Sequence, residues 1–232
     1  MDRYDKSIAE AEKAIEINPS LADAHRCLGN GYLQLGTLDQ ARAEFQKAYE
    51  LDPLSVMAGM NLAEVSGVMG REPDGITVLE RMNELHPNTP VIYAALASLY
   101  LWMRDYVRAQ EMLDKGLAIN PDEVFLQVNQ GLLYAFTGRR KEAQESLTEI
   151  QQSKFELNRL WGEVFIQTAL GNLNEAFKAL WRQAETHEWE YLIKYIPGFE
   201  ALHKDPRFRE FCAKVGIPPP TPPVSPQVGA PT

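Results

Sequence analysis

Apolar residues recur at spacings of three and four along much of the chain, which is typical of helices with one buried face. Two such segments are YDKSIAEAEKAIEINP (residues 4–19) and LDQARAEFQKAYELDP (residues 38–53), and both end at a proline. The prolines stand 34 residues apart, at Pro19, Pro53, Pro87 and Pro121. Because the residue before a proline is disfavoured in the α region, each step predicts the end of one helix. We expect the proline itself to begin the next helix, where its missing N–H is no loss.

A second helix break lies between the prolines. Gly36, Gly70 and Gly138 recur at multiples of the same spacing, each directly after an apolar helical segment. Glycine there can adopt the left-handed conformation that ends a helix. Arg104 stands at the corresponding place in the third repeat, so the turn is less clearly marked there. Each 34-residue repeat is therefore predicted to hold a helix A, a turn, a helix B and a proline turn.

One repeat carries a family signature. Its residues are His25, Leu28, Gly29, Tyr32, Ala41, Phe45 and Pro53. They resemble the tetratricopeptide repeat (TPR) signature W-x2-L-G-x2-Y…A-x3-F…P, with His25 in the tryptophan position. The resemblance implies an all-α, right-handed superhelical solenoid of helical hairpins over residues 1–186. The predicted units are a half repeat (1–21) and repeats 22–55, 56–89, 90–123, 124–157 and 158–186, the last with Gly171 one residue early.

The two ends of the chain depart from the repeat. The half repeat has only a helix B, so Ile8, Ala11 and Ile15 lack the helix against which they would be buried. Either the chain is a fragment of a longer protein, which we favour, or this edge packs against a second copy as a homodimer.

Residues 187–217 resemble the segment that ends TPR arrays in some bacterial adenylate/guanylate cyclases and winged-helix transcription regulators. The matching residues are Trp189, Leu192, Pro197, Phe199, Leu202, Asp205, Pro206, Arg207, Phe208, Gly216, Ile217 and Pro218. Asp205 is expected to cap a helix that Pro206 begins. We predict that Phe199, Leu202, Phe208 and Phe211 seal the open face of the last repeat. Residues 218–232 hold seven prolines and no charge, which predicts a disordered tail.

Composition narrows the functional classes. The net charge of −9 argues against a general nucleic-acid binder, and no apolar run is long enough to span a membrane. The two cysteines, Cys27 and Cys212, form no disulfide framework or zinc motif. The four histidines are scattered, and no nucleophile, phosphate-binding or dinucleotide motif occurs. We therefore expect a cytoplasmic protein that is not an enzyme and needs no metal or cofactor.

The resemblance implies a function for the concave face that the helices A line, which is the surface such arrays use for binding. The family's groove positions correspond to Arg26, Asn30, Gln34, Met57, Met60, Asn61, Glu64, Val91, Ser98, Leu101, Trp102, Phe125, Val128, Leu132 and Phe136, with Trp161 and Phe165 nearby. This surface is polar at one end and increasingly apolar toward the other. We expect it to bind a peptide or amphipathic helix of another protein. Alternatively, the C-terminal segment or closer packing covers these residues and makes them core.

Two narrower hypotheses concern single residues of this surface. Arg26, Asn30 and Asn61 match three positions of the clamp by which chaperone-binding TPR domains hold a terminal carboxylate. Val91 and Ala95 occupy the two basic positions, so the required charge is missing. Arg26 and Asn30 could instead make a weaker polar contact with a peptide.

The second full repeat contains unusual small residues. Gly59, Gly67 and Gly75 stand where larger residues would pack, and an interior glycine costs a helix about 1 kcal/mol relative to alanine. The glycines predict either a local hinge or close packing of the backbone.

The repeats and the absence of catalytic motifs lead to one functional class. The sequence predicts a protein–protein interaction scaffold, with a C-terminal regulatory module of a larger signalling protein as the alternative.

Overall fold

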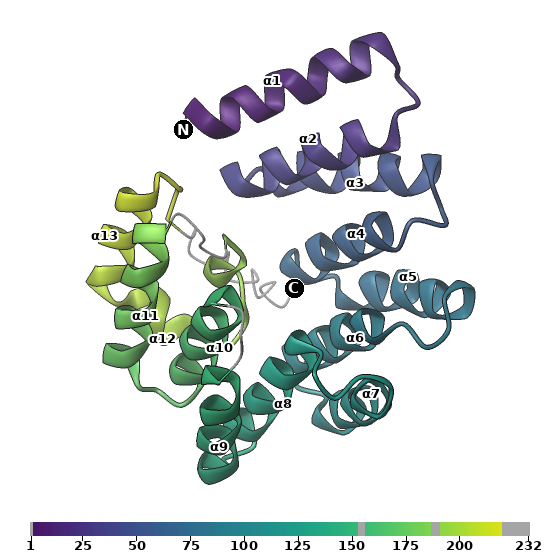
Figure 1. Ribbon diagram of the computed structural model, residues 1–232. Helices are drawn as coiled ribbons and strands as arrows, with labels where there is room; N and C mark the ends of the chain where they lie inside the picture. Colours follow the sequence, from purple (N-terminus) through teal and green to yellow (C-terminus); the bar gives the residue numbers. More distant parts are fainter. Residues whose placement is uncertain (1, 153–155, 187–190, 220–232) are drawn as a thin grey trace, which may run out of the picture.

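The computed structural model describes residues 2–152, 156–186 and 191–219, which form helices and no strand. The helices are α1 (Asp2–Ile17), α2 (Ala22–Leu35), α3 (Leu38–Leu51), α4 (Val56–Val68), α5 (Glu72–Leu85), α6 (Pro90–Trp102), α7 (Tyr106–Ile119), α8 (Val124–Phe136), α9 (Arg140–Gln151), α10 (Glu156–Ala169), α11 (Leu173–Thr186), the 3₁₀ turn η1 (Tyr191–Lys194), α12 (Glu200–Lys204) and α13 (Pro206–Val215). From α2 to α11 they form antiparallel pairs that stack along a curved path, as Figure 1 shows. This is the all-α helical-hairpin solenoid that the repeat predicts.

Each turn between helix A and helix B contains a residue whose backbone adopts the left-handed conformation. Gly36, Gly70 and Gly138 have φ values of 81°, 71° and 79°, as expected for glycines that end a helix. Arg104 adopts the same conformation with φ of 59°, although it carries a side chain. The third hairpin therefore turns as the others do, at the cost of a less favourable backbone conformation.

The proline turns differ from the expectation in one respect. Helices α2, α4, α6 and α8 begin three residues after each proline, not at the proline itself. The side chain of Asp52 accepts a hydrogen bond from the Leu54 N–H at 3.3 Å, and Asn18 accepts one from the Ser20 N–H at 3.1 Å. These bonds close an Asx turn that holds the proline between the two helices. The prediction that the proline starts the next helix is therefore wrong.

Each hairpin is packed through small residues of one helix and a large residue of the other. Phe45 on α3 is fully buried, and a Cβ on Gly29 of α2 would lie 2.6 Å from its ring. Residues 34 positions further along each time, Leu79, Leu113 and Leu147, are also fully buried. A large residue at this repeat position thus fills the space between helix A and helix B in every full repeat up to α9.

Close backbone packing accounts for the glycines of the second full repeat. A Cβ on Gly59 would lie 2.6 Å from Met82, one on Gly67 2.5 Å from Leu99, and one on Gly75 2.6 Å from the Ala63 carbonyl oxygen. Contacts this short leave no room for a side chain without a shift of the neighbour. The structure therefore supports the packing explanation of these glycines, the alternative to a hinge.

The C-terminal segment packs on the last hairpin as predicted. Phe199, Leu202, Phe208 and Phe211 are fully buried. Asp205 accepts a hydrogen bond from the Arg207 N–H at 3.0 Å and so caps α13, which begins at Pro206. The ring of Phe211 lies 6.1 Å from that of Trp181 on α11. Residues 187–190, which include Trp189, and residues 220–232 of the proline-rich tail lie outside the described residues.

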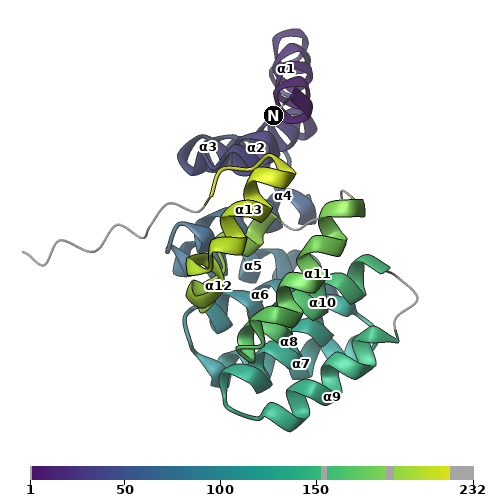
Figure 2. The ribbon, with the colours of Figure 1, turned by 90° about the vertical axis from the view of Figure 1, so that its left-hand side faces the viewer.

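The same segment also reaches the first full repeat, which the sequence did not predict. The Lys194 ammonium group donates a hydrogen bond to the Gln34 carbonyl oxygen at 3.2 Å, and the Tyr195 hydroxyl donates to that of Leu33 at 3.5 Å. Both acceptors belong to the last turn of α2, and the Leu33 oxygen also accepts a hydrogen bond from the Gly36 N–H at 3.1 Å. We call this pair of bonds the closing contact. In Figure 2 α13 lies in front of α2, α3 and α4, and α12 lies further from α2.

Candidate protein-binding surface

The helices A form the inner layer of the solenoid. Helices α2, α4, α6, α8 and α10 each contact the next one in this order, so equivalent residues of successive repeats lie in rows across the layer. A ligand that lay across the layer would meet one residue of each row in turn.

The polar end of the predicted groove is held by contacts within the protein. Arg26 is partly buried and donates a hydrogen bond to Asp23 at 3.1 Å. The Asn30 carbonyl oxygen accepts a bond from the Asn61 amide at 3.2 Å. Gln34 is half-buried, and its backbone carbonyl is the acceptor of the closing contact. Arg26, Asn30 and Gln34 therefore take part in contacts within the inner layer. Only their remaining exposed atoms are available to a ligand.

Asn61 and Asn129 stand at the same position of two different repeats, and each bridges neighbouring helices A. Asn61 is only 9% exposed and reaches back to Asn30 on α2. Asn129 is 6% exposed and donates to the Ser98 hydroxyl at 2.8 Å and to the Ala94 carbonyl at 2.9 Å. Asn61 was predicted to face the groove, whereas the structure gives it a structural role because its amide is used between helices.

Three predicted groove residues are in the interior. Leu101, Val128 and Leu132 are 3%, 5% and 4% exposed, and they belong to the main hydrophobic core. Neighbouring residues of this core therefore cover their side chains, which do not line an open groove. The prediction of these residues as groove-lining is therefore corrected.

The C-terminal segment covers part of the aromatic end. The ring of Phe199 lies edge-to-face on that of Phe165, with 5.6 Å between the centroids. Gly198 approaches Phe136 so closely that an added Cβ would lie 3.2 Å from its ring. Trp102 is half-buried against Gly67. The alternative that the C-terminal segment covers groove residues therefore holds for Phe136 and Phe165.

An apolar strip stays accessible at the other edge of the layer. Met57 and Phe125 are 53% and 44% exposed, and both are the second residue of their helix A. Met60, Val91 and Trp161 are partly exposed, and the rings of Phe125 and Trp161 lie 5.6 Å apart. We call these five residues the apolar rim. Ser98 and Glu64 are also partly exposed, but both take part in interactions within the protein.

Charged groups beside this layer are perturbed by burial. Glu123 caps α8 by accepting a hydrogen bond from the Leu126 N–H at 2.8 Å, and burial raises the pKa of its carboxyl group. Lys194 is 3% exposed, and burial lowers the pKa of its ammonium group to about 8. Its Nζ atom lies 4.9 Å from the centre of the Tyr195 ring. The C-terminal segment thus contains a buried cation, Lys194, whose charged form is destabilised by the loss of hydration.

The burial of Lys194 predicts a dependence of stability on pH. The native pKa of about 8 lies below the ordinary value of 10.5, so between these two values the unfolded chain binds more protons and stability rises with pH. We expect the unfolding free energy of the wild type, relative to Lys194→Met, to rise by about 1.4 kcal/mol from pH 7 to pH 9. Urea unfolding of both proteins at each pH measures it. A difference that stays constant over this range would contradict the burial of Lys194.

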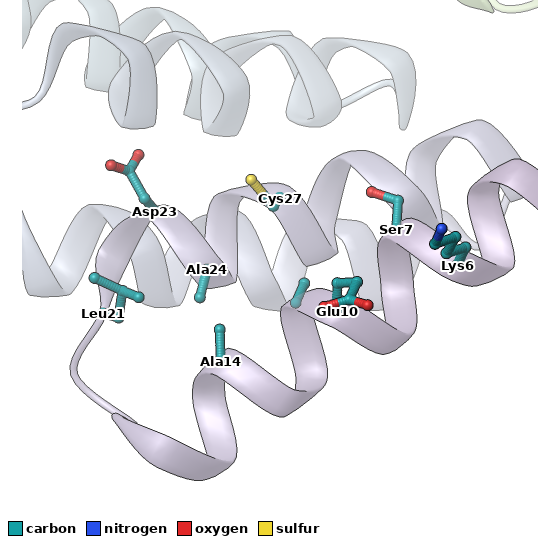
Figure 3. Close-up of a pocket in the computed structure, with 9 residues that line it drawn as sticks. Lys6, Ser7, Glu10, Ala14, Leu21, Asp23, Ala24 and Cys27 are labelled. Carbon is teal, nitrogen blue, oxygen red and sulfur yellow. The ribbon is translucent and has the colours of Figure 1, made fainter.

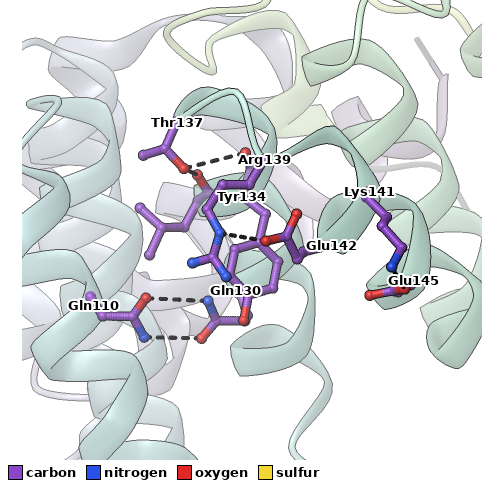
Figure 4. Close-up of polar contacts among 9 residues, drawn as sticks. Gln110, Gln130, Tyr134, Thr137, Arg139, Lys141, Glu142 and Glu145 are labelled. Carbon is purple, nitrogen blue, oxygen red and sulfur yellow. Dashed lines mark hydrogen bonds and ion pairs between the residues drawn. The ribbon is translucent and has the colours of Figure 1, made fainter.

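A further set of contacts joins α8 to its neighbours α7 and α9, which Figure 4 shows. Gln110 on α7 and Gln130 on α8 exchange amide hydrogen bonds at 3.3 and 3.4 Å. Arg139 lies over the Tyr134 ring at 4.2 Å and pairs with Glu142 at 2.9 Å. The exposed ion pair of Arg139 and Glu142 contributes little to stability.

Comparison with known proteins supports the fold. A family model for the tetratricopeptide repeat matches residues 22–55. The chain is 27% identical over 112 residues to Hsp70-Hsp90 organizing protein 3 of Arabidopsis thaliana, covering 48% of this chain and 20% of the relative. It is 26% identical over 156 residues to human tetratricopeptide repeat protein 13, covering 65% of this chain and 18% of that protein. The matches thus span about a fifth of the relatives, and neither is named as a cyclase or a transcription regulator.

A solved structure extends the likeness over most of the helices. The crystal structure of a TPR protein of Thermus thermophilus has a TM-score of 0.60 and 20% identity, and the match covers 75% of this chain and 96% of that one. The fold is a TPR solenoid. None of the described helices is long and apolar enough to cross a membrane. Among the described residues, no three His, Cys, Asp or Glu side chains gather as metal ligands would.

Proposed function

We propose that this solenoid is a protein–protein interaction scaffold that binds a peptide or amphipathic helix of another protein along the apolar rim. The observation that carries the proposal is the exposure of Met57 and Phe125 at the same position of α4 and α8, with Val91 between them on α6. A relative at 27% identity is named for organizing Hsp70 and Hsp90, which is also a role in holding proteins together.

The energetics favour apolar anchors on the ligand. Burial of a Met or Phe side chain contributes about 1.5–3 kcal/mol, and the rim offers several in a row. An exposed apolar patch of this kind marks a binding surface on a soluble protein. Part of the gain is offset by the loss of freedom on association, so the expected complex is a reversible one.

A carboxylate clamp is not part of the proposal. Arg26 is paired with Asp23, and Asn61 is used between helices. Val91 and Ala95 bring no positive charge to the third repeat. A ligand at the polar end would therefore meet the exposed atoms of Arg26, Asn30 and Gln34 as weak hydrogen-bonding partners.

The proposal predicts that the double variant Met57→Ala/Phe125→Ala binds its partner about 10- to 100-fold more weakly than the wild type, because two apolar anchors are lost. Partners recovered with the tagged chain are identified by mass spectrometry and then titrated in pure form by calorimetry. The matched control is Val107→Ala/Ile119→Ala on α7, where residues of 72% and 40% exposure lie on a helix B. Equal affinities of wild type and Met57→Ala/Phe125→Ala for every recovered partner would reject the rim as the binding surface.

A further inference from the structure

The C-terminal segment and the end of α2 meet across a narrow contact. Along its side, α2 lines an open groove of about 580 Å³ together with α1, which Figure 3 shows. The C-terminal segment meets the end of the helix instead, through the two bonds of the closing contact. Pro218 adds an apolar contact, because its Cγ atom would lie 3.7 Å from a Cβ on Gly36. A small set of side chains thus joins segments that are 160 or more residues apart in the sequence.

The apolar cores on the two sides of this contact are separate. The small core, between α2, α3 and α4, consists of Leu33, Ala41, Phe45, Leu62 and Val65. Phe199 and Leu202 of the C-terminal segment belong to the main core instead. Of the described C-terminal residues, only Tyr195 packs against the small core. Most of the apolar burial would therefore persist if the C-terminal segment and the end of α2 separated.

Polar groups within the contact are incompletely paired. The side-chain oxygen Oε1 of Gln34 is buried and has no hydrogen-bond partner in the described part of the chain. The Lys194 ammonium group has three N–H donors, of which one has an acceptor among the described residues, the Gln34 carbonyl oxygen at 3.2 Å. The Tyr195 hydroxyl bond is long, at 3.5 Å. Buried polar groups without partners regain hydration when they are exposed, which offsets the loss of the two bonds on opening.

Lys194 makes this balance depend on pH. Burial lowers the pKa of its ammonium group to about 8 in the closed form, whereas the ordinary value of 10.5 applies once the side chain is in water. Between these two values the open form binds more protons, so rising pH favours the closed form. Below pH 8 the ammonium group is charged in both forms, and the ratio of open to closed form levels off at its highest value.

The titratable groups on the neighbouring elements keep one protonation state between pH 7 and pH 9. Burial raises the pKa of Cys212 on α13 to about 11 and raises that of Tyr195 above its ordinary value of 10. It also raises the pKa of Tyr32 on α2 and lowers that of His203 on α12 below its ordinary value of 6.5. A change at this contact within that range therefore reports on Lys194.

We propose that the closing contact is a latch that opens and closes within the folded protein, and that proton uptake by Lys194 favours the open form. In the open form the solenoid flexes, the first full repeat moves away from the C-terminal segment, and Gln34, Lys194 and Tyr195 contact water. The latch lies at the C-terminal end of α2, whereas Met57 and Phe125 of the apolar rim lie at the start of their helices. The proposal therefore does not depend on the function proposed above.

Time-resolved fluorescence energy transfer on the full chain tests the latch. Donor and acceptor dyes are attached to Gln40→Cys on α3 and Lys214→Cys on α13, both exposed positions, and Cys27→Ser removes the exposed native thiol. Cys212 is 1% exposed and stays unlabelled. We expect two distance populations, and the ratio of open to closed form should rise about tenfold from pH 9 to pH 7, as pKa values of about 8 and 10.5 require.

Four variants separate the roles of the groups in the contact. Lys194→Arg keeps its charge and Lys194→Met has none, so both should lose the pH dependence. Lys204→Met, at an exposed position of α12, is the matched control and should keep the tenfold change. Gln34→Leu removes the unpaired oxygen and should shift the ratio toward the closed form at least about fivefold at either pH, with the pH dependence unchanged.

A second dye pair, on Gln144→Cys of α9 and Lys214→Cys, should show one distance from pH 7 to pH 9, because both positions lie on the C-terminal side of the latch. Three results would overturn the proposal. They are a single distance between residues 40 and 214 at both pH values, a pH dependence that survives in Lys194→Met or disappears in Lys204→Met, and a parallel change between residues 144 and 214. The last would place the movement within the C-terminal hairpins.

Discussion

Phe199→Ala is expected to lower the free energy of unfolding by about 3–5 kcal/mol. Phe199 is fully buried at the start of α12, where its ring lies edge-to-face on Phe165 of α10 at 5.6 Å. Truncation leaves a cavity between the C-terminal segment and the inner layer, and the surrounding helices can close it only in part. Urea unfolding followed by far-ultraviolet circular dichroism measures the loss.

Phe125→Ala is the matched control for this experiment. It removes the same side chain from a residue that is 44% exposed, and we expect a loss of no more than about 1 kcal/mol. Similar losses in the two variants would contradict the position of the C-terminal segment over α10. A loss confined to Phe199→Ala, with increased proteolysis after residue 190, would locate the damage in that segment.

Gly75→Ala is expected to destabilise the protein by about 1–3 kcal/mol more than Gly59→Ala. The new Cβ at residue 75 would lie 2.6 Å from the Ala63 carbonyl oxygen, so the backbone of α4 must move. At residue 59 the nearest atoms are those of Met82, an unbranched side chain that can turn aside. Both changes gain about the same helix propensity, so the difference isolates the packing.

Chemical denaturation of both variants provides this measurement. Hydrogen exchange over residues 56–80 adds a second one, because close packing predicts exchange no faster than in the neighbouring repeats. Equal stabilities of Gly75→Ala and Gly59→Ala, with fast exchange in this segment, would restore the hinge explanation of these glycines.

The hairpins could be predicted from the sequence because their determinants are local. Gly36 and the Asp52-Pro53 step act on the backbone within a few residues, so a fixed period in the sequence becomes a fixed period of helices. The prediction that the next helix begins at the proline set the start of that helix too early. The missed determinant was the side chain of Asp52, which closes a turn around the proline.

The candidate site was predicted only in part because burial on the inner side depends on distant segments. Met57 and Phe125 are exposed, whereas Leu101 and Leu132 are core residues. A signal was present in the sequence PVIYAALASLYLW of α6, which has no charged residue and is typical of a helix buried on all sides.

The residues of the closing contact were missed for the same reason. Lys194 and Tyr195 stand 160 and 162 residues from their acceptors on α2, and no local pattern marks such a pair. The lysine within the apolar run YLIKYIPGF was the available hint, because its stem packs along apolar neighbours and its ammonium group then needs a polar partner.

The closing contact changes how the repeats share their stability. In an open array each unit feels only its nearest neighbours, so the terminal units fray first and independently. Here the first full repeat is tied to the last segment, and its fraying must break bonds formed by residues at the far end of the chain. Unfolding of the first full repeat is therefore coupled to that of the C-terminal segment, whereas α1 lies outside this joint.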